Sequence, residues 1–239
     1  MMRLDYLFHG IHGVNDFRII KNNVKNGDNV VDLGANIGYF TLILAKLVGP
    51  TGKVFAFEPD PRNLALLKKN VEYNNYKNVI IVPKAVSNVN DKCTLYTGQK
   101  TFGQNKIYKP KKTKTQKFIP IDSETVRLDD FFKTNGLLDK ISFIKMDVEG
   151  AEFLALSGMK EILKLNKNIK IFTEAEISYL EDAGSSYDQF IDLLTENDFT
   201  FSLADNRTET LTKVNKSQLE KILNDEGSVN IFCVRELNS

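Results

Sequence analysis

The sequence predicts a doubly wound α/β fold, in which helices cover both faces of a mostly parallel sheet. Apolar strand-like runs alternate with amphipathic helical stretches after residue 28. One of these units, residues 29–45, reads as a buried strand that passes through a small-residue turn into a helix. The chain has 239 residues, which is enough to bury a full sheet between two helical layers within one domain.

The first unit of this fold is also the first candidate ligand site. Residues 29–33 are β-rich and apolar except for Asp32, and residues 39–48 carry bulky apolar side chains at helical spacing. Gly34 and Gly38 bracket the turn between them. Glycine has no Cβ and lets the backbone approach a ligand, so we expect an adenosyl group to lie on this turn.

The second strand, in KVFAFEPDP, ends in Glu58, 26 positions after Asp32. A carboxylate at the tip of the second parallel strand accepts hydrogen bonds from both hydroxyls of a ribose. Pro59 offers a flat apolar surface to a base. In the helix predicted over residues 61–74, Asp60 is the expected cap and Pro61 fits the first turn.

The remaining elements follow the same alternation, with one interruption. Residues 92–121 are lysine-rich and depart from the alternation of strands and helices. They predict a β-hairpin inserted after the third strand. The expected strands are 79–82, 142–146, 169–173 and 230–234, and the expected helices begin near residue 150 and span 186–197 and 217–224.

The glycine pattern discriminates between cofactors. A dinucleotide site requires GxGxxG, so that a pyrophosphate lies on the helix N-terminus. The run here is DLGANIG, in which Asn36 stands where the second glycine would be. Asp32 would place a negative charge near a dinucleotide's phosphates, whereas it suits the ammonium of a methionine moiety. The pattern therefore favours S-adenosylmethionine over a nicotinamide cofactor.

The chain resembles the FkbM family of class I S-adenosylmethionine-dependent methyltransferases. The resemblance rests on VVDLGANIGYFTLILAK, VFAFEPDPRN, VPKAVSN, VRLDDF and IKMDVEGAE, in family order. It implies a Rossmann-like, seven-stranded, mostly parallel sheet with an antiparallel C-terminal hairpin. It also implies methyl transfer, often to an oxygen of a sugar or natural product, without naming the acceptor, and it places Ala85 and Val86 at the adenine edge. The predicted cofactor-binding residues are Asp32, Gly34, Ala35, Asn36, Gly38, Tyr39, Thr41, Glu58, Pro59, Ala85 and Val86.

The predicted catalytic residues lie where the winding of the sheet reverses, between the first and fourth core strands. Transfer of a methyl group from a sulfonium requires the enzyme to orient the acceptor and remove its proton. Asp147 is the first choice for this work, Glu149 and Glu174 follow, and Lys145 would pair with Asp147 or contact the acceptor oxygen.

Alternatives remain open for these carboxylates. Glu149 is as well suited to holding its loop as to catalysis, and Glu152 fits a helix N-terminus, where acidic residues complement the helix dipole. The sequence contains no metal-ligand cluster, and a magnesium ion held by Asp147 and Glu174 is a variant of the mechanism.

Acceptor choice is expected to depend on two further segments. Residues 1–27 are predicted to form a cap or lid over the cleft, with residues 28–239 as the methyltransferase domain. His9 and His12 in the cap are expected to be surface or hydrogen-bonded histidines rather than metal ligands. The inserted hairpin is expected to present a solvated lysine loop, with a clamp on an anionic acceptor as the alternative. Its lysines are Lys106, Lys109, Lys111, Lys112, Lys114 and Lys117.

Bulk properties restrict the partners. The net charge of +1 gives no global attraction for a polyanion, so nucleic acid is an unlikely partner. Cys93 and Cys233 form no CxxC motif, and no run of about 18 apolar residues predicts a membrane span. We expect a cytoplasmic O-methyltransferase acting on a small-molecule or glycan acceptor. The alternatives are an RNA methyltransferase, a non-catalytic S-adenosylmethionine-binding protein and a nicotinamide-dependent oxidoreductase.

Overall fold

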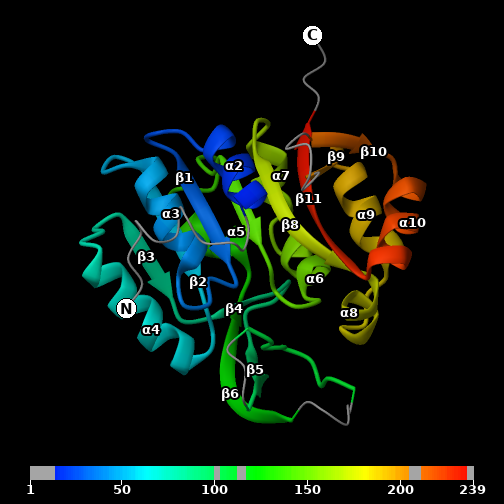
Figure 1. The fold of residues 1–239 in the computed structure, drawn as a ribbon. Coiled ribbons are helices and arrows are strands. Elements are labelled where there is room, and N and C mark those ends of the chain that lie inside the picture. The colour runs from blue at the N-terminus through cyan, green and yellow to red at the C-terminus, as the bar shows by residue number, and fades with distance from the viewer. Residues whose placement is uncertain (1–13, 100–102, 112–116, 205–210, 236–239) are drawn as a thin grey trace.

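The computed structural model describes residues 14–99, 103–111, 117–204 and 211–235. Its main sheet has the order β10-β9-β11-β8-β7-β1-β2-β3, in which β3, β2, β1, β7 and β8 are parallel (Figure 1). β11 runs antiparallel to both of its neighbours, so the predicted mostly parallel sheet with an antiparallel C-terminal hairpin is confirmed. The strands are β1 Asn29–Leu33, β2 Lys53–Phe57, β3 Val79–Val82, β7 Phe143–Met146, β8 Lys170–Glu176, β9 Phe199–Ala204, β10 Leu211–Val214 and β11 Ser228–Arg235.

The main sheet has eight strands among the described residues, one more than the seven expected. The additional strand, β10, pairs with β9 at the edge of the sheet. Its residues are largely exposed, including Leu211, so it lacks the alternation of buried and exposed positions that marks a strand in a sequence.

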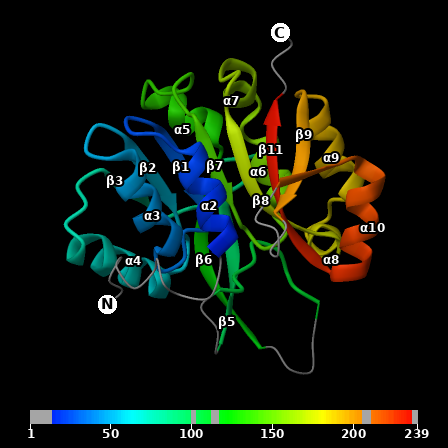
Figure 2. The same cartoon turned by 45° about the horizontal axis from the view of Figure 1, so that its top comes forward.

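The helices form two layers, as the alternation predicted. α2 Val14–Asn23, α3 Tyr39–Val48 and α4 Pro61–Tyr73 pack on one face of the sheet (Figure 2). Val30 and Phe143 belong to the core cluster on this face. Val31 and Leu33 point to the other face. That face is covered by α5 Leu128–Thr134, α6 Glu152–Ser157, α7 Lys160–Leu165, α9 Tyr187–Thr195 and α10 Lys216–Glu226.

The residues at the start of α4 form the predicted helix cap. The Asp60 side chain accepts a hydrogen bond from the Arg62 main-chain nitrogen at 2.8 Å, and Pro61 occupies the first turn of α4, as predicted. The single helix expected near residue 150 is instead two short helices, α6 and α7, with α8 Ile177–Asp182 following β8.

The inserted segment forms a second sheet beside the main one. β5 Lys92–Gly98 and β6 Phe118–Val126 pair as the predicted antiparallel hairpin, and β6 also pairs with β4 Ala85–Val86. The hairpin extends away from the main sheet (Figures 1 and 2). Arg62 links it to α4 through a 3.0 Å hydrogen bond to the carbonyl of Gly98.

The described part of the predicted cap is helix α2. Ile19, Ile20 and Val24 are buried in the core with Phe172 and Phe232, so this helix packs on the sheet. Residues 1–13, including His9 and His12, lie outside the described residues, and the cap remains a prediction. Within the described ranges, no helix combines the length and apolar character needed to cross a bilayer.

Candidate functional site

A cleft of about 560 Å³, counting the space open to solvent, lies at the carboxyl ends of β1, β2 and β7. β1 and β7 are neighbours, with Asp32 opposite Lys145, so the reversal of winding falls where the sequence predicted it. Eight predicted site residues line the cleft: Gly34, Asn36, Glu58, Pro59, Ala85, Val86, Asp147 and Glu149.

Gly34 brings the turn after β1 against the end of β7. It adopts φ +74°, and a Cβ added there would overlap the main-chain oxygen of Asp147. The Asp147 nitrogen in turn donates to the Leu33 carbonyl at 3.1 Å. The two predicted motifs are therefore in direct contact at this glycine.

Glu58 is buried and held by backbone amides. Its carboxylate accepts hydrogen bonds from the nitrogens of Asn36 and Asp60, both at 2.8 Å. Burial raises the pKa of Glu58 to about 7, although these hydrogen bonds oppose the shift. A carboxylate has about four lone-pair directions, so Glu58 retains capacity for ribose hydroxyls at the cleft wall.

Asp32 lies behind the turn and is fully buried. Its Oδ2 accepts a hydrogen bond from the Thr41 hydroxyl at 2.5 Å, and its Oδ1 has no hydrogen-bond partner among the described residues. Burial raises the pKa of Asp32, while the nearby Lys145 ammonium opposes that shift. A buried acceptor without a donor fits the predicted ammonium of S-adenosylmethionine.

Two cleft asparagines carry further unsatisfied acceptors. Asn36, at φ +51°, and Asn105 each bury a side-chain oxygen that has no hydrogen-bond partner in the described structure. Both line the cleft. Hydroxyl and amino groups of an adenosyl ligand are donors of the kind these oxygens lack. Asn105 was missed by sequence reasoning because it belongs to the irregular inserted segment.

Five predicted cofactor residues lie outside the cleft lining: Asp32 and Thr41, which are buried behind the turn, and Ala35, Gly38 and Tyr39. The Ala35 nitrogen donates to the Phe57 carbonyl at 3.0 Å, and Gly38 begins α3 at φ +99°. Tyr39 stacks edge-on against Phe40, with ring centroids 4.9 Å apart. These contacts shape the turn, and direct cofactor contact by these residues remains a prediction.

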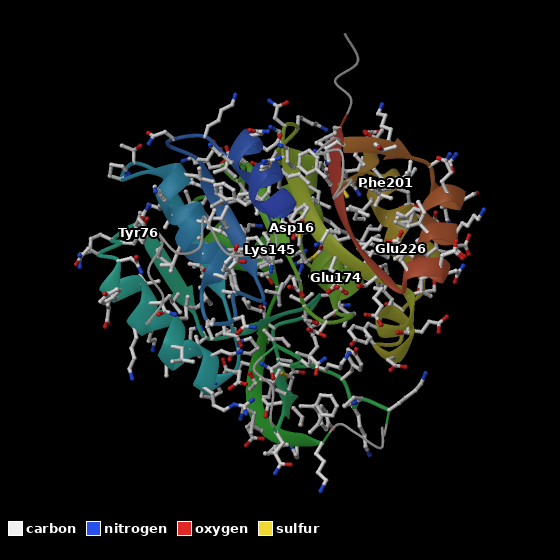
Figure 3. All side chains as sticks on the ribbon, in the orientation of Figure 1. Asp16, Tyr76, Lys145, Glu174, Phe201 and Glu226 are labelled. Atoms are coloured by element: carbon white, nitrogen blue, oxygen red, sulfur yellow. The ribbon has the colours of Figure 1, made fainter. Side chains whose placement is uncertain are left out.

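Charged side chains gather beside Asp147 on the α2 face of the sheet. The Lys145 ammonium lies 3.2 Å from the Asp147 carboxylate. Figure 3 shows Asp16, Lys145 and Glu174 close together near the centre of the molecule. Burial opposes the charge on Lys145, yet Asp147 and Asp32 outweigh it and raise the pKa of Lys145.

Asp16 was missed by sequence reasoning. It lies on α2 and accepts a hydrogen bond from Asn230 on β11 at 3.2 Å. Burial raises its pKa, and the Lys145 ammonium opposes the shift. The only sequence signal was a single acid in a segment without clear periodicity, so nothing local connected it with β7.

Three glutamates near the end of β7, namely Glu149, Glu152 and Glu174, have raised pKa values. Burial, reinforced by Asp147, raises the pKa of Glu149 to about 8 and that of Glu174 to about 7. Burial also raises the pKa of Glu152 to about 7. Glu152 accepts a 3.1 Å hydrogen bond from the Val148 nitrogen, which fits its structural role at the start of α6.

The lysine loop differs from the expectation at one residue. Lys109, Lys111 and Lys117 are exposed, as a solvated loop requires, whereas Lys106 is buried. The prediction that Lys106 belongs to a solvated loop is therefore wrong. Its main chain pairs with Tyr96 of β5, which fixes the segment against the hairpin. Lys112 and Lys114 lie outside the described residues.

Neither cysteine is in a disulfide: Cys93 is partly buried and Cys233 is buried. The described residues contain no group of three or more His, Cys, Asp or Glu arranged to hold a metal ion. Asp147 and Glu174 remain the pair on which a magnesium-assisted variant would depend.

The strand order and the cleft at the β1 and β7 ends define a class I methyltransferase domain. A family model, the methyltransferase FkbM domain, matches residues 32–201, more than half of the chain. The chain therefore belongs to the FkbM methyltransferase family. Its domain is an S-adenosylmethionine-dependent methyltransferase domain, with S-adenosylmethionine as the cofactor.

Individual relatives agree with this assignment. Methyltransferase 1 of Beauveria bassiana is 27% identical over 146 residues, which cover 55% of this chain and 58% of that protein. The 2-O-methyltransferase NoeI of Sinorhizobium fredii is 29% identical over 176 residues, covering 69% of this chain and 70% of that protein. The match to the Beauveria protein thus spans less than two thirds of its length.

A solved structure supports the fold. The crystal structure of methyltransferase FkbM from Methylobacillus flagellatus superposes with a TM-score of 0.50 at 19% identity. The superposition covers 86% of this chain and 43% of that chain. At this identity the likeness concerns the fold alone.

Proposed function

We propose that this protein methylates a hydroxyl group of a sugar, a glycan or another small natural product, with S-adenosylmethionine as the donor. The observation that carries the proposal is the position of two carboxylates, Asp147 and Glu149, on the wall of the cofactor cleft itself. A hydroxyl acceptor must lose a proton as the methyl group arrives, and both carboxylates stand beside the cleft where that proton would be released. The name of NoeI, a 2-O-methyltransferase, supports oxygen as the methylated atom.

The cofactor is assigned to the half of the cleft formed by β1, β2 and β4. Glu58 would accept hydrogen bonds from the ribose, and Pro59, Ala85 and Val86 line the space for the base. Asp32, buried behind the turn with an unpaired Oδ1, would suit the methionine ammonium. When bound, S-adenosylmethionine supplies a methyl group that is already activated on a sulfonium. The protein therefore needs to orient an acceptor and take up its proton.

In our proposal, one carboxylate orients the acceptor and another takes up its proton. Asp147, anchored by Lys145, accepts a hydrogen bond from the acceptor hydroxyl and orients it. Glu149 takes up the proton, because a pKa of about 8 makes its carboxylate a far stronger base than an ordinary glutamate. Glu174, at the end of β8 with a pKa raised to about 7 by burial and by Asp147, is the second choice.

The carboxylates that line the cleft also restrict the class of acceptor. Lys106 is buried against Tyr179 and is not free to clamp an anion, whereas Lys111 is exposed beside Asp182. Carboxylates line the cleft at the end of β7. A neutral acceptor rich in hydroxyl groups therefore fits this side of the cleft better than a nucleic-acid backbone.

The test combines binding with turnover. Calorimetric titration with S-adenosylhomocysteine should show binding, and incubation of the protein with radiolabelled S-adenosylmethionine and panels of monosaccharides and oligosaccharides should transfer label. Asp147→Asn and Glu149→Gln should lose transfer while retaining binding. Absence of binding by the unaltered protein would remove the proposal. Binding without transfer to any acceptor would support a non-catalytic role. Cytoplasmic location and oligomeric state are separate predictions that these assays leave untouched.

A further inference from the structure

Lys106 is a buried cation in a segment whose other described lysines are exposed. Only 5% of its surface is accessible, and its main chain forms two hydrogen bonds with Tyr96 of β5, at 2.8 and 3.0 Å. These hydrogen bonds fix this part of the inserted segment against β5. Burying an ammonium costs free energy unless neighbouring groups compensate, so its surroundings indicate what it does.

The ammonium of Lys106 is compensated by two tyrosines. Its Nζ lies 3.2 Å from the ring centroid of Tyr179 on α8 and donates a 2.9 Å hydrogen bond to the hydroxyl of Tyr108. The Tyr108 hydroxyl donates in turn to the main-chain oxygen of Glu149 at 2.7 Å. A continuous chain of contacts therefore leads from Lys106 to the proposed base.

The loop at the end of this chain of contacts has an unusual backbone. Glu149 adopts φ +56°, a left-handed conformation that a residue with a side chain keeps only where its surroundings hold it there. At Gly150, φ is +102°, and an added Cβ would lie 2.7 Å from the Tyr108 hydroxyl and overlap the Tyr179 main-chain oxygen. The loop is therefore enclosed between the inserted segment and α8.

Electrostatic interactions also couple Lys106 to Glu149 and to the carboxylates around it. The carboxylates that favour the charged form of Lys106 come from three places: Glu149 and Glu152 after β7, Glu176 at the end of β8, and Asp182 on α8. Glu149 is faced by Asp147, Glu152 and Glu174, which disfavour its carboxylate form, and by Lys106, which favours it. Burial is the largest influence on both, lowering the pKa of Lys106 and raising that of Glu149.

We infer that Lys106 is a positioning residue for methyl transfer. Through Tyr108 it holds the main chain of Glu149 in its left-handed conformation, and its ammonium supports the carboxylate form of that side chain. The inserted hairpin thus completes the proton-accepting side of the site, in addition to bordering the cleft. This inference rests on the proposed role of Glu149.

The direct test is a pH titration of Glu149 by carbon NMR on protein with ¹³C-labelled glutamate carboxyl groups, assigned with Glu149→Gln. In Lys106→Met, the midpoint for Glu149 should rise by about one pH unit, because an opposing charge nearby has been removed. Lys106→Arg should restore the midpoint, and Lys109→Met, an exposed lysine of the same segment, should leave it unchanged. An unchanged midpoint in a folded Lys106→Met protein would overturn the inference.

Stability provides a second route if Lys106→Met folds poorly. Lys106 and Glu149 each favour the charged form of the other, and removing one of two coupled buried groups costs more than removing both. The double variant Lys106→Met with Glu149→Gln should therefore recover part of the melting temperature that Lys106→Met loses, and no recovery would count against the coupling.

Titration calorimetry with S-adenosylhomocysteine separates this inference from the proposed function. Failure of the unaltered protein to bind would remove the proposed function. Normal binding together with an unshifted Glu149 would remove only the role of Lys106.

Discussion

The two halves of the cleft are built differently. In the cofactor half, main-chain amides hold the carboxylate of Glu58, at 2.8 Å each, and they come from residues within a few positions of two short motifs. In the acceptor half, at the end of β7, two buried lysines and two half-buried tyrosines hold the loop and carboxylates after β7. They come from the inserted segment, β7 and α8.

This difference has a consequence for function. Main-chain donors are present whatever the side chains are, so the cofactor half changes little when its sequence drifts outside the motifs. The acceptor half depends on particular side chains from elements that tolerate insertion and substitution. With this division, the acceptor half can change to accept a different substrate while the cofactor half continues to bind the same cofactor.

The largest effect is expected at Glu58. Glu58→Ala removes the proposed acceptor of two ribose hydroxyls and leaves the nitrogens of Asn36 and Asp60 unpaired. Hydrogen bonds to a charged group contribute about 1.5–3 kcal/mol each, so the Kd for S-adenosylhomocysteine should rise by about 100-fold or more. Calorimetry measures this change. Glu72→Ala, an exposed acid on α4, is the matched control, and equal affinities in the two variants would contradict the assignment of the ribose site.

A large effect on stability is expected at the junction of the two halves. Gly34→Ala forces a left-handed conformation on alanine and places its Cβ against the Asp147 carbonyl, at a combined cost of about 3 kcal/mol. The melting temperature should fall by about 6–12 °C.

Gly136→Ala is the matched control, which separates the effect of the contact between Gly34 and Asp147 from the effect of the left-handed backbone conformation. Gly136 has a similar φ of +66°, but no atom lies within 4 Å of an added Cβ. Gly136→Ala should therefore cost only about 1–2 kcal/mol. Equal melting temperatures for the two variants would show that the contact between Gly34 and β7 is loose.

Sequence reasoning succeeded where a local pattern encodes the structure. Strand and helix alternation, the glycine turn and the cap of α4 by Asp60 are properties of neighbouring residues, and the structure confirms the fold drawn from them. The same motifs placed Asp147 beside Gly34, because parallel strands end at one edge of the sheet.

The features that the sequence did not predict depend on contacts between segments far apart in the chain. The position of Asp16 depends on how α2 packs against the sheet, and that of Lys106 depends on its pairing with β5. In the sequence, Lys106 is one of six lysines within twelve positions, and nothing local distinguishes the buried one. β10 was missed because its side chains are largely exposed.

The pH dependence of stability should contain a contribution from Glu149 in the acceptor half. The folded pKa of Glu149 is about 8, above the ordinary value of 4.5, so the folded protein holds this proton more tightly than the unfolded chain. Its contribution is fully present below about pH 4.5 and is lost as pH rises through about 8. Glu152 and Glu174, and Glu58 in the cofactor half, have pKa values of about 7 and act in the same direction.

The melting temperature should therefore fall by several degrees between about pH 5.5 and pH 8.5, as measured by calorimetry. Glu149→Gln keeps the shape of the side chain and removes its titration, so it should flatten this fall. Glu124→Gln, an exposed acid on β6, should leave the slope unchanged. A variant of Glu149 with the original slope would show that its carboxylate is already ionised at neutral pH.

The smallest effect is expected for a lysine that is only superficially similar to Lys106. Lys111 lies within ion-pair distance of Asp182 on α8, but its side chain is 78% exposed. Water and salt screen such a pair, and holding two long side chains together costs entropy. Lys111→Ala should change the melting temperature by less than about 2 °C and leave S-adenosylhomocysteine affinity unaltered, whereas Lys106→Met should lower the melting temperature clearly. Equal losses in the two variants would mean that the total positive charge of the inserted segment, rather than the buried ammonium on Tyr179, stabilises the acceptor half.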